Sequence, residues 1–252
     1  MRPIALTDEP WTKILGFLRT CSRIYIGPED ECRRFVEGVL WRLRSGAQWR
    51  LLPAEYGNWN SVYKRFARWC DHGVWEQMMG NFADDPDMEN VMLDGTIVRA
   101  HPCAAGASKK RWTGSASVGT ESGGVSTKIH AKVDGLGNPL RFIVTGGERH
   151  ESTQGEALLG EQVGEYGLAD RALDSDDFIA FLIDHGAIPV IPSRKNRKQP
   201  REYDTWRYRE RALVECFFNK IKHFRHIFSR FDKLASRFLG FLHLAGTLIW
   251  LR

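Results

Sequence analysis

Four residues late in the sequence form a spaced set that could handle a phosphate group: Tyr208, Arg211, Glu215 and Lys222. On a helix these four side chains would lie within an arc of about 60°. An acid beside an aromatic hydroxyl and two cations suits a carboxylate that reaches a metal while its neighbours bind phosphate oxygens. The alternative is a surface network of i, i+4 ion pairs, which such helices often carry.

Two further acids follow short apolar runs that are typical of strands. Asp94 follows Val-Met-Leu, and Asp170 follows Gly-Leu-Ala. Carboxylates at the carboxyl ends of strands in an open α/β sheet could hold hard divalent cations such as Mg²⁺. Alternatively, each Asp caps a turn or a helix. Asp174, Asp176 and Asp177 compete for the second position, but they fall where a helix cap and first turn belong, so Asp170 is preferred.

The elements that would position these acids change in type after residue 90. Residues 100–124 are rich in Gly, Ala, Ser and Lys and predict a loop, and Asp134-Gly135 indicates a hairpin turn. The pattern predicts strands at 90–94, 127–133, 140–144, 166–170 and 188–191, and helices at 151–163, at 174–185 and from near Tyr208 onward. This order predicts an α/β fold, a ribonuclease-H-like mixed sheet flanked by helices.

The N-terminal part predicts helices only. One helix should begin near Pro28 and end at Gly46, and a second should follow Asn58 or Asn60 and stop at Gly73. Their short link resembles a helix-turn-helix, whose second helix enters the major groove; the alternative is a small bundle with a solvated basic face. We therefore expect a helical DNA-binding domain at 1–82, a linker at 83–90 and a catalytic domain at 91–252.

Composition narrows the class of protein. Lys and Arg outnumber Asp and Glu by 36 to 31 in 252 residues, and the net charge of +5 is compatible with a polyanionic partner. The five cysteines are scattered, which predicts free thiols in a reducing cytosol, and His101 with Cys103 lacks further zinc ligands. The start shows no secretory signal, and the apolar stretch 238–251 is shorter than the roughly 18–20 residues of a membrane span. A buried terminal helix is expected there.

The spacing Tyr-x2-Arg-x3-Glu-x6-Lys resembles the signature of transposases in the insertion-sequence-four and insertion-sequence-five groups. The resemblance to the latter covers about residues 30–252 and needs no large gap. Two segments depart from it: Arg171-Ala-Leu replaces a basic-Gly-Tyr segment, and Leu51 replaces an acid. Other segments that carry the resemblance include Gly-Ala-Gln-Trp-Arg-Leu-Leu-Pro at 46–53, Leu-Asp-Gly-Thr at 93–96, Gly-Asn-Pro-Leu-Arg at 137–141 and Val-Ile-Pro at 190–192.

The resemblance implies a DDE transposase that binds insertion-sequence ends and catalyses Mg²⁺-dependent DNA cleavage and strand transfer. Asp94, Asp170 and Glu215 would be its catalytic acids and would ligate two Mg²⁺ ions, with Mn²⁺ as a substitute. Tyr208, Arg211 and Lys222 would contact the phosphates of the transposon end. The alternatives are an inactive DNA-binding protein derived from a transposase, and a metal-dependent nuclease of the same fold.

The implied partner is double-stranded DNA, both the terminal inverted repeats and the target. Because two ends must be joined, a homodimer or higher assembly on DNA is expected, in the bacterial cytoplasm, associated with the nucleoid when bound, and without a membrane. The expected DNA contacts are Lys64, Arg65, Arg68, Lys109, Lys110, Arg111, Arg194, Lys195, Arg197 and Lys198.

Overall fold

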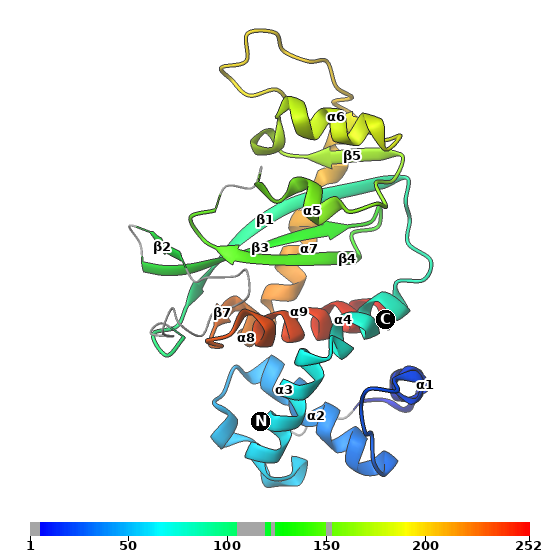
Figure 1. Ribbon diagram of the computed structural model, residues 1–252, viewed down its shortest axis with the longest axis vertical. Helices are drawn as coiled ribbons and strands as arrows, with labels where there is room; N and C mark the ends of the chain where they lie inside the picture. The colour runs from blue at the N-terminus through cyan, green and yellow to red at the C-terminus, as the bar shows by residue number, and fades with distance from the viewer. Residues whose placement is uncertain (1–5, 105–118, 122–123, 150–152) are drawn as a thin grey trace. The chain divides into compact units, whose positions relative to one another are not determined.

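A computed structural model describes residues 6–104, 119–121, 124–149 and 153–252 (Figure 1). The expected DNA contacts Lys109, Lys110 and Arg111 lie outside the described residues. Packing divides the chain into two compact units, one of residues 1–82 with 221–252 and the other of residues 83–220.

The first unit is helical. Its helix α2 begins after Pro28 and ends before Gly46, which has the left-handed φ of 65° that glycine tolerates, as predicted. The Asn58 side chain caps the next long helix by accepting from the amides of Asn60 and Ser61. The helices are α1 Asp8–Thr20, α2 Glu29–Ser45, α3 Trp59–Asp71, α4 Val74–Phe82, α8 Arg225–Phe228 and α9 Ala235–Trp250, with 3-10 turns η1 Trp49–Leu51 and η2 Ala54–Tyr56 and the short strand β7 Ser229–Arg230.

The connection between α2 and α3 is longer than a helix-turn-helix requires. It covers residues 46–58 and contains both 3-10 turns, whereas the helix-turn-helix link has about three or four residues. The helical character of this part is confirmed. The link itself forms two turns because Pro53 and Gly57 flank η2.

The C-terminal residues pack with the N-terminal helices, which differs from the expected single domain at 91–252. Helix α9 contacts α4 and α3, and the ring centroids of Phe241 and Phe66 are 4.5 Å apart. Arg237 on α9 also donates both terminal nitrogens to Asp71 on α3, at 2.6 and 3.0 Å. The apolar helix α9 is thus buried against aromatic side chains of the N-terminal helices. In the described residues, no helix has the length and apolarity needed to cross a bilayer.

The second unit is built on a mixed sheet in the order β4-β3-β1-β5-β6, with β2 added beside β3. Strands β4, β3 and β1 are antiparallel neighbours, while β1, β5 and β6 run parallel. This is the predicted ribonuclease-H-like arrangement. The strands are β1 Asn90–Ala100, β2 Gly119–Glu121, β3 Gly124–Val133, β4 Pro139–Gly146, β5 Tyr166–Ala169 and β6 Ile188–Val190; the helices are α5 Gly155–Leu159, α6 Asp176–Asp184 and α7 Ala212–Lys222, with 3-10 turns η5 Arg171–Leu173 and η6 Arg207–Arg211.

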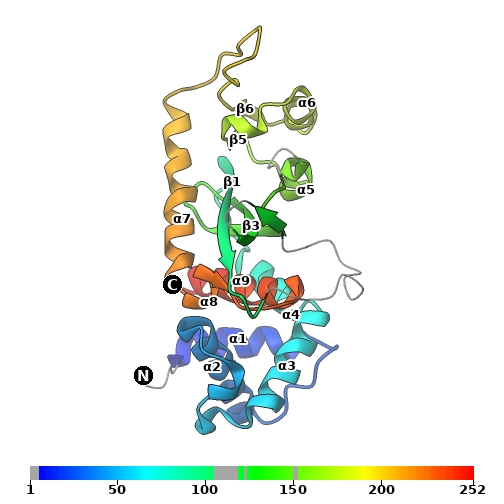
Figure 2. The same cartoon turned by 90° about the vertical axis from the view of Figure 1, so that its left-hand side faces the viewer.

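The two faces of this sheet have different partners. Helices α5 and α6 cover one face and α7 lies along the other (Figure 2). Leu93 of β1 and Ala169 of β5 belong to the apolar cluster with α5 and α6. Because side chains alternate along a strand, the residues that follow these two, Asp94 and Asp170, are directed to the α7 side.

Three expected boundaries shift. Strand β1 does not end at Asp94 but continues to Ala100, because β3 pairs with it as far as Arg99 opposite Ser126. The final helical region begins as the 3-10 turn η6, and α7 ends at Lys222. The helix expected at 151–163 is described only as the short α5.

The cap of α3 gives a stability test. Replacing Asn58→Ala removes the acceptor for two backbone amides and should lower the free energy of unfolding by about 1 kcal/mol. Urea denaturation measures this, with Asn60→Ala as the matched control because Asn60 contributes only its backbone amide to the cap. Equal losses for the two variants would contradict the assignment of the cap.

Candidate active site

Asp94 and Asp170 occupy equivalent places on adjacent parallel strands. Leu93 lies opposite Ala169 in the β1–β5 pair; Asp94 is the next residue of β1, and Asp170 is the first residue after β5. The Asp94 side chain is only 12% exposed, and its Oδ1 accepts from the Gly95 amide at 2.8 Å. The Oδ1 of Asp170 accepts from the Ala172 amide at 2.8 Å and so caps η5. The two carboxylates therefore have fixed positions beside each other.

Glu215 reaches Asp94 through a shared cation. The Arg211 guanidinium donates Nη1 to Glu215 Oε1 at 2.8 Å and Nη2 to Asp94 Oδ2 at 3.1 Å. The side chain of Arg211 is 15% exposed, whereas that of Glu215 is 60% exposed. Asp94 and Glu215, which are more than 100 positions apart in the sequence, are thus bonded to the same guanidinium, while their role as metal ligands stays a prediction.

Nearby charges act on Arg211 and Tyr208. Burial lowers the pKa of Arg211, but the charge of Asp94 and the hydrogen bond to Glu215, with a smaller effect of Asp170, raise it above its ordinary value. The pKa of Tyr208 is also raised, mainly by burial and further by Asp170, against the effect of Arg211. Tyr208 therefore keeps its phenolic proton at neutral pH and can donate a hydrogen bond.

The turn η6, which carries Tyr208 and Arg211, is anchored to the start of β1. Arg207 Nη1 donates to Glu89 Oε1 and to Asn90 Oδ1, both at 2.9 Å, and Asn90 Nδ2 donates to Glu210 Oε2 at 2.5 Å. The Arg207 guanidinium also lies 3.6 Å from the centroid of the Tyr166 ring. Sequence reasoning missed these positioning residues, because polar residues so far apart carry no local pattern.

The carboxylates suit a divalent metal by donor type and by charge. Asp and Glu oxygens are the ligands that Mg²⁺ prefers, and here they already surround one positive group, Arg211. Asp94, Asp170 and Glu215 are the residues that would hold such an ion. Within the described part of the chain, no three His, Cys, Asp or Glu side chains stand together as a ready metal-binding group.

The expected DNA contacts on α3 have different surroundings. Lys64 and Arg68 are exposed. Arg65 is instead held inside the first unit: its Nη2 donates to the Ile26 carbonyl at 2.8 Å, and its guanidinium lies 4.4 Å from the Phe35 ring centroid. Burial lowers its pKa. Lys222 is the last residue of α7 and is partly exposed.

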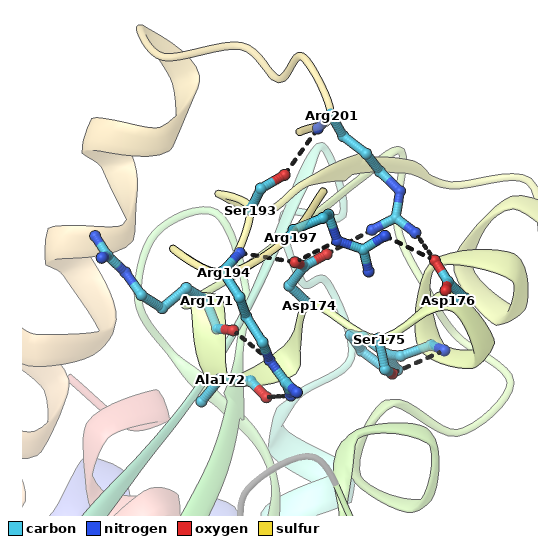
Figure 3. Close-up of polar contacts among 10 residues, drawn as sticks. Arg171, Ala172, Asp174, Ser175, Asp176, Ser193, Arg194, Arg197 and Arg201 are labelled. Carbon is cyan, nitrogen blue, oxygen red and sulfur yellow. Dashed lines mark hydrogen bonds and ion pairs between the residues drawn. The ribbon is translucent and has the colours of Figure 1, made fainter. Parts of the chain in front are cut away.

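In the basic loop at 194–198, the arginines have partners within the fold and the lysines are exposed. Arg197 donates to Asp174 Oδ2 at 2.8 Å and to Asp176 Oδ1 at 3.0 Å, and the Arg194 side chain donates to the backbone carbonyls of Arg171 and Ala172 (Figure 3). Lys195 and Lys198 are exposed, and neither forms an ion pair with another residue that the structure describes. Asp174 and Asp176, which competed with Asp170 as the second acid, are both occupied by arginines.

The sheet is ribonuclease-H-like, and its carboxylates lie at neighbouring strand positions and on the facing helix. Such an arrangement suits metal-dependent phosphoryl transfer on nucleic acids. The family model described as "Transposase DDE domain" matches residues 85–250, more than half of the chain. A second, described as "Putative transposase of IS4/5 family", matches residues 6–79. The chain therefore belongs to the DDE transposases of the IS4/5 family.

Individual relatives agree with this family. The chain is 39% identical over 130 residues to the "Putative transposase for insertion sequence element IS6501" of Brucella ovis, which covers 51% of this chain and 100% of the relative. It is 40% identical over 106 residues to a Sinorhizobium fredii protein named y4sN, which covers 42% of this chain and 85% of that protein. A crystal structure of a pre-cleavage Mos1 transpososome covers 98% of both chains at 8% identity and a TM-score of 0.28, which is too low to support a comparison.

The bridge made by Arg211 gives a second test. Replacing Arg211→Gln removes the ion pair that Arg211 forms with the largely buried Asp94 and should lower the free energy of unfolding in EDTA by about 1–3 kcal/mol. Arg209→Gln is the matched control, because Arg209 is exposed on the same turn. Urea denaturation compares the two. If the variants are equally stable, the bridge does not hold the acids in the metal-free protein.

Proposed function

We propose that this protein is a transposase that binds the ends of an insertion sequence and catalyses metal-dependent DNA cleavage and strand transfer. The observation that carries the proposal is the Arg211 guanidinium, which bonds both Asp94 and Glu215, with Asp170 directly after the strand that pairs with the strand of Asp94. In a member of a DDE transposase family, two acids from distant parts of the chain that share one cation, with a third acid beside the neighbouring strand, are best explained as the catalytic acids.

The chain's own residues position DNA and balance its charge. Two Mg²⁺ or Mn²⁺ ions held by Asp94, Asp170 and Glu215 would activate a water or a 3′-OH as nucleophile and offset charge on the leaving oxygen. Arg211 would exchange its carboxylate partners for a phosphate oxygen of the bound DNA, because a guanidinium binds either anion in the same way. Tyr208, which keeps its proton, and Lys222 would donate to neighbouring phosphate oxygens.

Exposed cations would supply the wider DNA contact. Lys64 and Arg68 on α3 and Lys195 and Lys198 in the basic loop are free to reach phosphates by their exposure. Because both ends of an element must be joined, the active form on DNA is a homodimer or a higher assembly. Its place is the bacterial cytoplasm, on the nucleoid when DNA is bound.

Cleavage and joining test the proposal. Wild-type protein should nick DNA that carries the element's end in Mg²⁺ or Mn²⁺ but not in EDTA, and should join a pre-cleaved 3′-OH end to target DNA. Asp94→Asn should reduce nicking by at least about 1,000-fold, since the remaining acids cannot hold two ions. Asp184→Asn, an exposed acid on α6, is the matched control.

The outcomes separate the alternatives. DNA binding without any metal-dependent nicking would indicate an inactive protein derived from a transposase. Nicking without joined products would indicate a nuclease of the same fold. Nicking that survives in Asp94→Asn would rule out the assigned acids.

Salt dependence tests the exposed lysines. The affinity for end DNA should fall steeply as salt rises, because phosphate contacts release counterions. Replacing both Lys195→Gln and Lys198→Gln should reduce the slope of log affinity against log salt by about 2. Lys13→Gln is the control, because Lys13 pairs with Glu9 at 2.9 Å. An affinity of wild-type protein that salt leaves unchanged would refute the DNA-binding assignment, and an unchanged slope in the double variant would refute it for these lysines.

A further inference from the structure

Asp174 is the buried centre of a charge cluster that the proposed chemistry does not use. Its side chain is 1% exposed, and three arginines donate to it: the Arg194 amide at 2.8 Å, Arg197 Nε at 2.8 Å and Arg201 Nη1 at 2.5 Å. Arg197 and Arg201 also bond Asp176, so two carboxylates and two guanidiniums form a closed ring (Figure 3). A buried carboxylate with this many donors is fully compensated.

The charge of Asp174 is maintained in the folded protein. Burial acts to raise its pKa, but the Arg194 amide and the hydrogen bonds and charges of Arg197 and Arg201 hold the pKa of this carboxyl below its ordinary value. The stability that the ionised Asp174 contributes to the folded state is therefore complete above the ordinary pKa of Asp, and it is lost only as the pH falls through the lowered pKa. The cluster is intact at neutral pH.

A chain of hydrogen bonds leads from this cluster to the acid that ends β5. The amide of Arg194 is fixed by Asp174, and the side chain of Arg194 turns back to donate Nη2 to the Ala172 carbonyl at 2.7 Å and Nε to the Arg171 carbonyl at 3.3 Å. The amide of Ala172 in turn donates to Asp170 Oδ1 at 2.8 Å. Ala172 is thus held through its carbonyl by Arg194 and through its amide by Asp170.

The ends of the basic loop are also tied together. The amide of Arg201 donates to Ser193 Oγ at 2.8 Å, which closes the loop around the cluster. The Arg197 side chain is 20% exposed, and its Nε and Nη1 already bond the carboxylates of Asp174 and Asp176. The loop is therefore a fixed element over η5, from which Lys195 and Lys198 extend to solvent.

We propose that Asp174, acting through Arg194, is a positioning residue for Asp170, and that Arg194 and Arg197 serve this clamp and do not contact DNA. The inference rests on the proposed function, because that function makes the Asp170 carboxylate a catalytic group whose position matters. Residues that orient a ligating carboxylate affect metal affinity and activity about 10–100-fold without touching the substrate. This assignment revises the expectation that all four cations of the loop bind DNA.

The experiment compares Asp174→Asn with Asp177→Asn, an exposed acid in the same segment. Asp174→Asn should lower kcat for Mg²⁺-dependent nicking at saturating DNA by about 10-fold or more. It should also weaken Mn²⁺ binding to the DNA-free protein, followed by electron paramagnetic resonance, while the Kd for end DNA changes less than twofold. Asp177→Asn should match wild type. A kcat in Asp174→Asn within twofold of the control overturns the proposal, as does an effect confined to DNA affinity.

A second variant covers the case in which Asp174→Asn fails to fold. Arg194→Met removes the bonds to the Ala172 and Arg171 carbonyls but leaves Asp174 paired with Arg197 and Arg201. It should lower kcat to a similar extent, and the double variant should lose little more, because both residues act in one chain. An unchanged kcat in Arg194→Met overturns the clamp.

Hydrogen exchange separates this inference from the proposed function. Asp174→Asn and Arg194→Met should each speed exchange of the Ala172 amide at least about tenfold relative to Asp177→Asn, since its carbonyl restraint is lost. Unchanged exchange overturns the clamp whatever the activity. If the wild-type protein neither nicks DNA nor binds Mn²⁺, the proposed function fails, while faster exchange still supports the mechanical link from Asp174 to Asp170.

Discussion

The bridge from Arg211 to Asp94 and Glu215 is the interaction on which the site depends. Asp94 and Asp170 are neighbours on parallel strands and both are partly withdrawn from water, so their negative charges repel at short range in a medium that screens poorly. A cation beside them offsets this repulsion. Much of the second unit serves to place that cation, since η6 is tied by Arg207 to Glu89 and Asn90 at the start of β1.

The two faces of the sheet have different roles: one packs into the apolar core, and the other carries the acids. Leu93 and Ala169 pack into the apolar cluster with α5 and α6, and the alternation of a strand then directs Asp94 and Asp170 to the opposite side. On that side, Phe142 of β4 stacks with Phe217 of α7 at 5.8 Å, which sets the distance of the helix from the sheet. The carboxylates thus directly follow buried, paired strand residues, which suits groups that must hold a precise geometry.

How well the sequence predicts a feature of this structure depends on how far apart in the sequence the interacting residues lie. The order of strands and helices and the limits of α2 follow from local patterns. The four-residue spacing pointed to Glu215 as an acid of the site, and that assignment stays a prediction. The role of Asp174 does not follow from local patterns, because a single acid just before a predicted helix looks the same in sequence whether it caps that helix or is buried under three arginines. The extent of β1 was also hidden, since it depends on pairing with β3 about 30 residues later. The place of α9 depends on aromatic partners at the other end of the chain.

Charge is a poor guide to DNA contact in this protein because arginine and lysine are used differently. Arg65, Arg194, Arg197, Arg207 and Arg211 each direct some of their donors to carbonyls, carboxylates or rings within the fold, a use that suits the fixed fork of the guanidinium. Lys64, Lys195 and Lys198 extend into solvent, where the ammonium group on its flexible side chain keeps its hydration and loses no free energy by burial. Lys132 departs from this division, since its buried Nζ donates to the Leu159 carbonyl at 2.8 Å and so satisfies the end of α5. The excess of 36 cations over 31 acids therefore overstates the number available to phosphates, because several arginines are structural parts of the two units.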